Sequence, residues 1–239
     1  MIGYGNFLFR HRNWVFPLVM ILLFGAFRPV PAGGEAAADL WLDIAGIAVV
    51  LAGLALRGAV VGLAYIKRGG LQKKVYADDL VTTGMFAHGR NPLYVGNALM
   101  IAGYLMIHNN PWVYALGGLF FGTAYHAIVA AEEVFLRAKF GAAYEAYCRD
   151  VPRWSIRLVG LSRTFAGMEF NWRRVVAKDY STAVTAAITV LALLAWQTLD
   201  RYGIDAARGP LLLYGVLLLA VPLAGIAISR AKKRGWLKV

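Results

Sequence analysis

Six long apolar stretches dominate this sequence and restrict what the chain can fold into. Most of them approach or exceed the roughly 20 apolar residues that an α-helix needs to cross a bilayer core. They lie near residues 13–28, 40–66, 93–108, 111–131, 181–199 and 211–229. Because backbone groups cannot stay unpaired in lipid, the pattern predicts an all-α fold. We expect one polytopic transmembrane bundle of about six helices, with residues 1–239 forming a single membrane domain.

The placement of the basic residues predicts how this bundle is oriented. Lysine and arginine concentrate before the first stretch and after the second, fourth and sixth stretches, whereas the opposite loops hold only Arg28, Arg201 and Arg208. Basic residues are retained in cytoplasmic loops, so both termini are predicted to be cytoplasmic. The cytoplasmic groups are Arg10 and Arg12; Lys67, Arg68, Lys73, Lys74 and Arg90; Arg137 through Lys178; and Arg230, Lys232, Lys233, Arg234 and Lys238.

The net charge of +12 is explained by the same loops. A chain that is 59% hydrophobic and places its charge between apolar runs is typical of a membrane protein, and we expect no nucleic-acid partner. Arg57 is different because it lies inside the second apolar stretch. An unpaired charge is costly there, so we predict that Arg57 faces protein or a wet cavity, in either a structural or a functional role.

A first polar motif covers residues 82–96, just before and within the third apolar stretch. A glycine-punctuated loop supplies backbone donors, Arg90 lies at the membrane boundary, and Pro92 opens a helix. The positive N-terminal end of a helix favours an anionic group, so this region can hold a carboxylate. The alternative is a simple turn in which Arg90 reaches lipid headgroups.

A second motif is the acidic doublet Glu132-Glu133, where the fourth apolar stretch ends. The apolar pattern continues to Phe140, so we expect the helix to run on and to stop at Gly141. Helical spacing places His126 with Glu133 on one face and Tyr125 with Glu132 on the adjoining face. Adjacent acids beside lipid need cationic partners, which a bound cation, Arg90 or Arg137 can provide; the alternative is ordinary interface charge.

A third motif covers residues 140–154. Tyr144 and Tyr147 lie one helical turn apart, so both can face one pocket or the membrane interface. Without context, this stretch is typical of an amphipathic interfacial helix that ends at Pro152. The basic and aromatic residues of segment 132–180 suit an anionic membrane surface, so we expect contact with membrane lipids. The histidines show no helical ligand spacing, and we predict no metal site.

Taken in order, the three motifs resemble the isoprenylcysteine carboxyl methyltransferase family and its phospholipid methyltransferase relatives. That family shows a G-x-[FY]-x-x-x-R-[HN]-P-x-Y-x-G stretch, then E-E-x-x-L-x-x-x-F-G-x-x-Y-x-x-Y and V-P. The first part matches Gly84, Phe86, Arg90, Asn91, Pro92, Tyr94 and Gly96. The second part matches Glu132, Glu133, Leu136, Phe140, Gly141, Tyr144, Tyr147, Val151 and Pro152. The resemblance covers residues 80–154.

The resemblance implies a membrane methyltransferase that binds S-adenosyl-L-methionine at the cytoplasmic ends of the third and fourth helices. The residues it implies for the cofactor are His88, Arg90, Asn91, Pro92, Tyr94, Gly96, Tyr125, Glu132, Glu133, Tyr144 and Tyr147. Glu132 or Glu133 would take the cofactor's ammonium, and Arg90 or the helix N-terminus its carboxylate. His88 and the tyrosines are candidates for adenosine contacts.

The expected acceptor is a lipid or lipophilic small molecule that enters from the bilayer. A carboxylate acceptor needs only an orienting cation, for which Arg149 and Arg153 are candidates, whereas an amine needs a base such as Glu133 or His126. Asn91 and Asp150 depart from the residues that the eukaryotic carboxyl methyltransferases usually have, so the prenylcysteine substrate does not follow. We expect a bacterial inner-membrane protein with a cytoplasmic active site.

Two other functions remain open from the sequence. One is a nicotinamide-dependent membrane reductase of the sterol-reductase type, whose C-terminal region resembles this family. The other is a transporter or scaffold in which Arg57 and the acidic doublet line a pathway. Residues 181–229 form an additional helical hairpin beyond the matched motifs, which either closes a lipid-facing pocket or mediates formation of a homo-oligomer.

Overall fold

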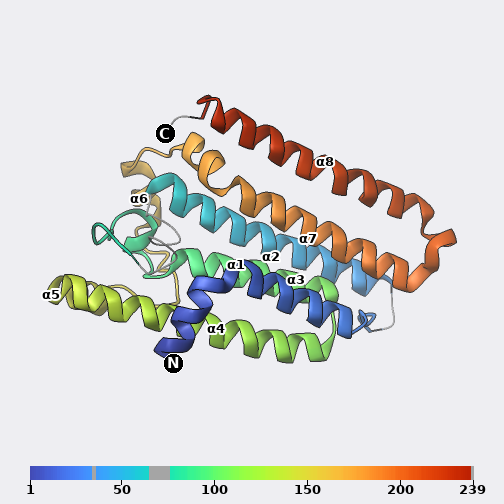
Figure 1. Cartoon of the computed structure of the whole chain (residues 1–239), viewed down its shortest axis with the longest axis horizontal. Coiled ribbons are helices and arrows are strands. Elements are labelled where there is room, and N and C mark those ends of the chain that lie inside the picture. Colours follow the sequence, from blue (N-terminus) through green and yellow to red (C-terminus); the bar gives the residue numbers. More distant parts are fainter. Residues whose placement is uncertain (34–35, 65–75, 238–239) are drawn as a thin grey trace.

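The computed structural model describes residues 1–33, 36–64 and 76–237, and within them all regular structure is helical (Figure 1). Six long helices account for most of it: α1 (Ile2–Ala26), α2 (Ala36–Leu63), α3 (Pro92–His108), α4 (Pro111–Phe140), α7 (Trp172–Ala206) and α8 (Arg208–Lys233). Three short ones are the 3₁₀ helix η1 (Gly84–Ala87), α5 (Ala142–Asp150) and α6 (Leu161–Gly167). The predicted all-α polytopic bundle is therefore confirmed.

Five of the described helices, α1, α2, α4, α7 and α8, are long and apolar enough to cross a membrane. The chain is thus an integral membrane protein. The sixth expected span, α3, has 17 residues. At 1.5 Å per residue it is about 26 Å long, slightly shorter than a hydrocarbon core of about 30 Å. It nevertheless lies within the bundle, along α2 and beside α4 and α7.

Several helices extend beyond the apolar stretches that predict them. α1 begins at Ile2 and not at residue 13, and α7 begins at Trp172 and not at residue 181. Hydropathy marks only the part of a helix that suits lipid, whereas backbone hydrogen bonding continues into the polar flanks. The predicted end of α4 at Gly141 is confirmed, because Gly141 follows Phe140 with a φ of +50°. The last two residues of the predicted 40–66 stretch lie outside the described residues, as do Lys67, Arg68, Lys73, Lys74 and Lys238.

Glycine pairs bring α2 and α3 into close antiparallel contact. A Cβ added at Gly53 would lie 2.5 Å from the carbonyl oxygen of Gly96, and one added at Gly103 would lie 2.5 Å from that of Gly46. Small residues of this kind let two membrane helices approach with their backbones. A similar approach joins α1 to α4, where a Cβ on Gly5 would clash with the backbone of Ala127.

The bundle has one end at which the start of α1, the end of α8 and the short helices gather. The start of α1, the end of α8, α5 and α6 all lie toward the left in Figure 1, whereas the end of α1, the start of α2 and the α3–α4 and α7–α8 connections lie at the opposite end. At the edge of the bundle, α8 packs on α7 and leaves large apolar side chains such as Leu212, Leu219 and Leu223 exposed, as expected for a surface in contact with lipid.

Candidate active site

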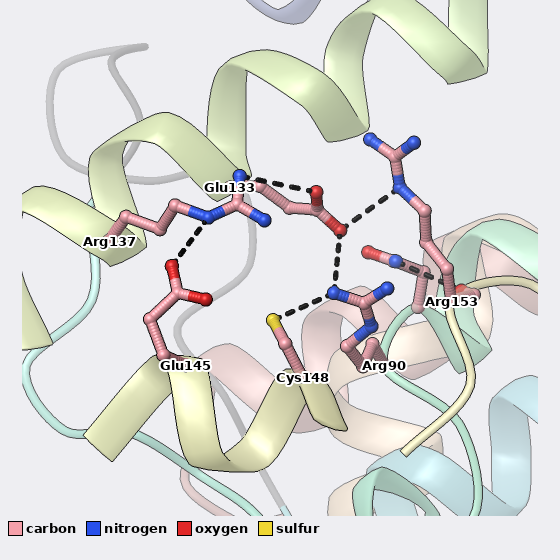
Figure 2. Close-up of polar contacts among 7 residues, drawn as sticks. Arg90, Glu133, Arg137, Glu145, Cys148 and Arg153 are labelled. Atoms are coloured by element: carbon pink, nitrogen blue, oxygen red, sulfur yellow. Dashed lines mark hydrogen bonds and ion pairs between the residues drawn. The ribbon is translucent and has the colours of Figure 1, made fainter. Parts of the chain in front are cut away.

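Glu133 is the centre of a buried ion-pair cluster near the end of α4. Its side chain is 6% exposed, and its Oε1 lies 3.0 Å from Nε of Arg153 and 3.3 Å from Nη1 of Arg90. Its Oε2 lies 3.8 Å from Nη1 of Arg137, one turn further along α4. Figure 2 shows these guanidinium groups converging on the carboxylate from α4, from the loop that precedes α3 and from the segment after α5. One buried carboxylate is therefore the shared counter-charge of several arginines.

The turn at Gly141 folds α5 back beneath this cluster. Arg90 donates from Nη1 to the sulfur of Cys148 at 2.7 Å, and Arg137 pairs with Glu145 at 2.9 Å. Tyr147 donates to the carbonyl oxygen of Phe86 at 2.7 Å. Burial raises the pKa of the Tyr147 phenol, so the group keeps its proton and serves as a donor.

The chain on either side of η1 is joined to the chain after α5 by a ladder of hydrogen bonds. The backbone N–H of Arg90 donates to Pro152, that of Arg157 donates to His88, and the side-chain amide of Asn91 donates to the carbonyl of Arg153. The His88 ring is buried and bonds the carbonyl oxygen of Arg157 at 2.7 Å and Oγ1 of Thr164 at 2.8 Å. These contacts hold Arg90 and Arg153 in place around Glu133.

Glu132, the other acid of the doublet, has a different environment. Its Oε1 accepts a hydrogen bond of 2.6 Å from the Tyr94 hydroxyl, and the Tyr94 ring lies 5.6 Å from the ring of Tyr125. No arginine or lysine nitrogen of the described residues lies within ion-pair distance of Glu132. The two neighbouring acids therefore have separate roles, since Glu133 is paired with arginines and Glu132 retains free acceptor capacity.

A cavity of about 840 Å³ opens beside the doublet. This volume is within the usual range of small-molecule sites, about 300–1,000 Å³. Its walls come from α1, α2, α3, α4, α5 and α7, together with segment 76–81 and Phe86 of η1. Apolar and aromatic side chains form much of it, and the charged and polar groups of the acidic doublet, Arg90 and the tyrosines converge on it.

Most of the residues predicted for the cofactor line this cavity. They are Arg90, Asn91, Pro92, Tyr94, Tyr125, Glu132, Glu133, Tyr144 and Tyr147. His88 and Gly96 are not among the lining residues, because His88 bonds the segment after α5 and Gly96 packs against Arg57 and Gly53 of α2.

The remaining predicted catalytic residues lie outside the cavity lining. His126 is exposed, with its ring stacked 6.5 Å from that of Trp154, and Arg149 is exposed on α5. Arg153 reaches the cluster only through its pairing with Glu133.

The structure adds lining residues that the motifs did not indicate. Arg57 of α2 lines the cavity and is paired with Asp179 of α7, with Nη2 2.5 Å from Oδ1 and Nε 3.2 Å from Oδ2. Arg57 also donates to Asn97 and Thr182, which line the cavity as well. The prediction that Arg57 faces protein or a cavity is confirmed, and its position inside an apolar stretch was the signal. α7 becomes a wall of the site through this ion pair.

Two further parts of the wall lie outside the three motifs, although segment 67–92, which contains the first of them, is long enough and polar enough to act on a substrate. One is segment 76–81, where the carbonyl oxygen of Ala77 accepts a hydrogen bond from Lys139 of α4. Arg12 of α1 was interpreted only as a topology residue. Among the described residues, no group of three or more His, Cys, Asp and Glu side chains is arranged to hold a metal ion.

Comparisons with known proteins identify one relative and one matching family. The chain is 28% identical over 153 residues to the nickel-cobalt-cadmium resistance protein NccN of Alcaligenes xylosoxydans xylosoxydans, covering 64% of this chain and 68% of that protein. No solved structure matches the chain. Residues 43–143, which include Arg90 and the acidic doublet, match the phospholipid methyltransferase family, in agreement with the membrane methyltransferase family that the motifs resemble.

Proposed function

We propose that this protein is an S-adenosyl-L-methionine-dependent methyltransferase of the membrane that acts on a lipid or lipophilic acceptor. One observation supports this most strongly. Arg90 and the acidic doublet, which come from separate motifs within the matched region, meet at a single cavity near the end of the apolar helices. A site at that depth is accessible both to a water-soluble cofactor and to a substrate dissolved in the bilayer.

The residues around the cavity fit the charges of the cofactor. Glu132 has free acceptor capacity for an ammonium group, and Nε of Arg90 is a buried donor without a partner among the described residues, available to a carboxylate. Tyr94, Tyr125 and Tyr144 provide aromatic surface for the adenosine. When bound, S-adenosyl-L-methionine supplies a methyl group activated by a sulfonium.

The protein's contribution to methyl transfer is mainly to position and to exclude water. Transfer is an in-line displacement in which charge is neutralised, so alignment in a dry cavity supplies most of the acceleration. The cluster of Glu133 with Arg90 and Arg153 keeps the cavity's shape rigid. For an amine acceptor, Glu132 is the carboxylate in position to take the proton, because Glu133 already faces three guanidinium groups. His126 and Arg149 face elsewhere and have no part in this proposal.

We further propose that the end of the bundle with the site faces the cytoplasm of a bacterial inner membrane. Most basic residues of the described chain lie in the segments at this end, as in cytoplasmic loops generally. The expected partners are membrane lipids, a lipophilic substrate and, across the exposed face of α8, a second copy of the chain.

Transfer of an isotopic label tests the function directly. The purified protein is incubated with methyl-labelled S-adenosyl-L-methionine and native membrane lipids, and the lipids are analysed by mass spectrometry. We expect a labelled lipid, which disappears with Glu132→Gln and persists with Glu145→Gln, a variant of the same chemistry at an exposed site.

Three results would argue against the proposal. Labelling that survives Glu132→Gln would remove Glu132 from the site. Calorimetric binding of a reduced nicotinamide cofactor, together with no binding of S-adenosyl-L-methionine, would favour the reductase function, and binding of neither would favour a transporter or scaffold.

A further inference from the structure

Arg12 of α1 lines the cavity although it lies outside residues 43–143, the region that matches the family. Its position is fixed by the packing of α1 on α4. Leu8 and Phe9 form a buried cluster with Ala124 and Ile128, and Gly5 allows the close approach of the two helices. The Arg12 guanidinium lies over the Phe9 ring, 4.2 Å from its centroid. Arg12 is thus held against the cavity by its own helix and not by an ion pair.

The Nη1 atom of Arg12 is buried and has no hydrogen-bond partner among the described residues. The described part of the chain also contains no carboxylate within ion-pair distance of this guanidinium. Burying a donor of a charged group without an acceptor costs free energy. A guanidinium N–H without an acceptor in a cavity wall can donate a charge-assisted hydrogen bond to an anionic group of a ligand.

Glu132 lines the same cavity and supplies the complementary charge. The Arg12 guanidinium is near enough to act electrostatically on the Glu132 carboxylate, yet the two are not joined by an ion pair. Of the other arginines that line the cavity, Arg57 is paired with Asp179 and Arg90 with Glu133, so each already has a counter-charge. Arg12 and Glu132 therefore form a separated pair of opposite charges that face one space.

We infer that Arg12 binds the anionic group of a zwitterionic ligand whose cationic group lies against Glu132. Two ligands have this chemistry: the amino-acid end of S-adenosyl-L-methionine, with a carboxylate and an ammonium, and an aminophospholipid headgroup, with a phosphate and an ammonium. The cofactor arm of this inference rests on the proposed function, whereas the lipid arm requires only that the cavity admits a headgroup.

Calorimetric titration of the full-length protein in detergent distinguishes the two sources. The cofactor probes are S-adenosylhomocysteine and its decarboxylated form, which keeps the adenosine and the ammonium. The lipid probe is a short-chain phosphatidylethanolamine. The test variants are Arg12→Gln and Arg12→Lys, and the matched control is Arg10→Gln, which removes the same charge from an exposed position of the same helix.

If the cofactor's carboxylate binds Arg12, the wild type prefers S-adenosylhomocysteine over the decarboxylated form by about 10- to 100-fold, the usual value of a charge-assisted hydrogen bond. Arg12→Gln removes that preference, and Arg12→Lys, which keeps the charge but loses the planar fork, retains part of it. If the phosphate binds Arg12, the same loss falls on phosphatidylethanolamine and the cofactor preference is unchanged. Arg10→Gln behaves as the wild type in both cases.

Equal affinities of Arg12→Gln and Arg10→Gln for all three probes would overturn the inference. Should Arg12→Gln fail to fold, the wild-type preference and the Arg12→Lys variant decide the question. A wild type that binds S-adenosylhomocysteine no better than its decarboxylated form, and that does not bind the lipid, overturns the inference equally. A wild type that binds neither adenosyl compound contradicts the proposed function, and the lipid titration then tests Arg12 separately.

Discussion

Arg90, two residues before α3, and Glu133, near the end of α4, lie 3.3 Å apart between Nη1 and Oε1. Both side chains are largely buried, at 13% and 6% exposure. The contact joins the two motifs that are far apart in the sequence, and Arg153 adds the segment after α5 to the same carboxylate. Glu133 thus determines the architecture of the site, whereas Glu132 is the acid that remains available to a ligand.

Replacing Glu133 with glutamine is expected to destabilise the protein severely. The change leaves the largely buried Arg90 and the partly exposed Arg153 without this counter-charge, and breaking a buried ion pair from one side costs about 3–5 kcal/mol. Thermal unfolding of the purified protein in detergent measures the effect. The matched control, Glu145→Gln, removes a carboxylate that is 51% exposed and should cost less than about 1 kcal/mol. Equal stability of the two variants would show that the cluster does not support the fold.

Asp179→Asn is expected to release α7 from the wall of the cavity. Asp179 and Arg57 are 6% and 8% exposed, so the variant leaves Arg57 with a buried and uncompensated charge, at a cost of about 3–5 kcal/mol. Adding Arg57→Met should restore much of the lost stability, because a buried pair replaced by apolar groups is close to neutral. Asp205→Asn, at an exposed position of α7, is the control. No recovery in the double variant would contradict this account.

The hydrogen bond from Tyr147 to Phe86 gives a prediction for alkaline pH. Burial raises the folded-state pKa of Tyr147 above the ordinary value of about 10 for a tyrosine. The protonated phenol therefore contributes its full stabilisation below pH of about 10, and this stabilisation is lost as the pH rises through the raised pKa of the folded state. Tyr147→Phe should lower the unfolding temperature near neutral pH, because the carbonyl of Phe86 loses its donor. It should also make the unfolding temperature less sensitive to pH above about 10. A pH dependence identical to that of the wild type would exclude Tyr147 as its source.

The sequence predicted those parts of this molecule that depend on hydropathy and on local motifs. The apolar stretches indicated the long helices, Gly141 indicated the end of α4, and the charge of Arg57 inside an apolar stretch indicated a polar partner. The motifs around Arg90 and Glu133 also predicted correctly that these two segments meet. In each case the physical cause acts within a few residues or through a charge that cannot remain unpaired in lipid.

Other features depend on how helices dock, which hydropathy does not report. Arg12 was interpreted as a topology residue because any basic residue before a first span has that role, and only the packing of α1 on α4 brings it to the cavity. His88 looked like a cofactor ligand because it lies in the motif, yet its ring bonds Arg157 and Thr164. Asp179, the partner of Arg57, is on α7, beyond the matched region, and no sequence motif singles it out.

The glycines between α2 and α3 lead to the last prediction, which concerns the scaffold behind the site. A Cβ at Gly53 would lie 2.5 Å from the carbonyl oxygen of Gly96 and 2.8 Å from Cγ of Met100. Gly53→Ala must therefore push the two helices apart, with an overpacking cost of about 1–3 kcal/mol. The same shift moves α3, which holds Tyr94 and Asn97 in the cavity wall, so cofactor affinity should fall together with the unfolding temperature. Gly122→Ala of α4, whose added Cβ would meet no atom within 4 Å, controls for helix propensity and should leave stability unchanged or raise it by about 0.5–1 kcal/mol. If Gly53→Ala is as stable as Gly122→Ala, the close approach of α2 and α3 is not what holds this wall of the site in place.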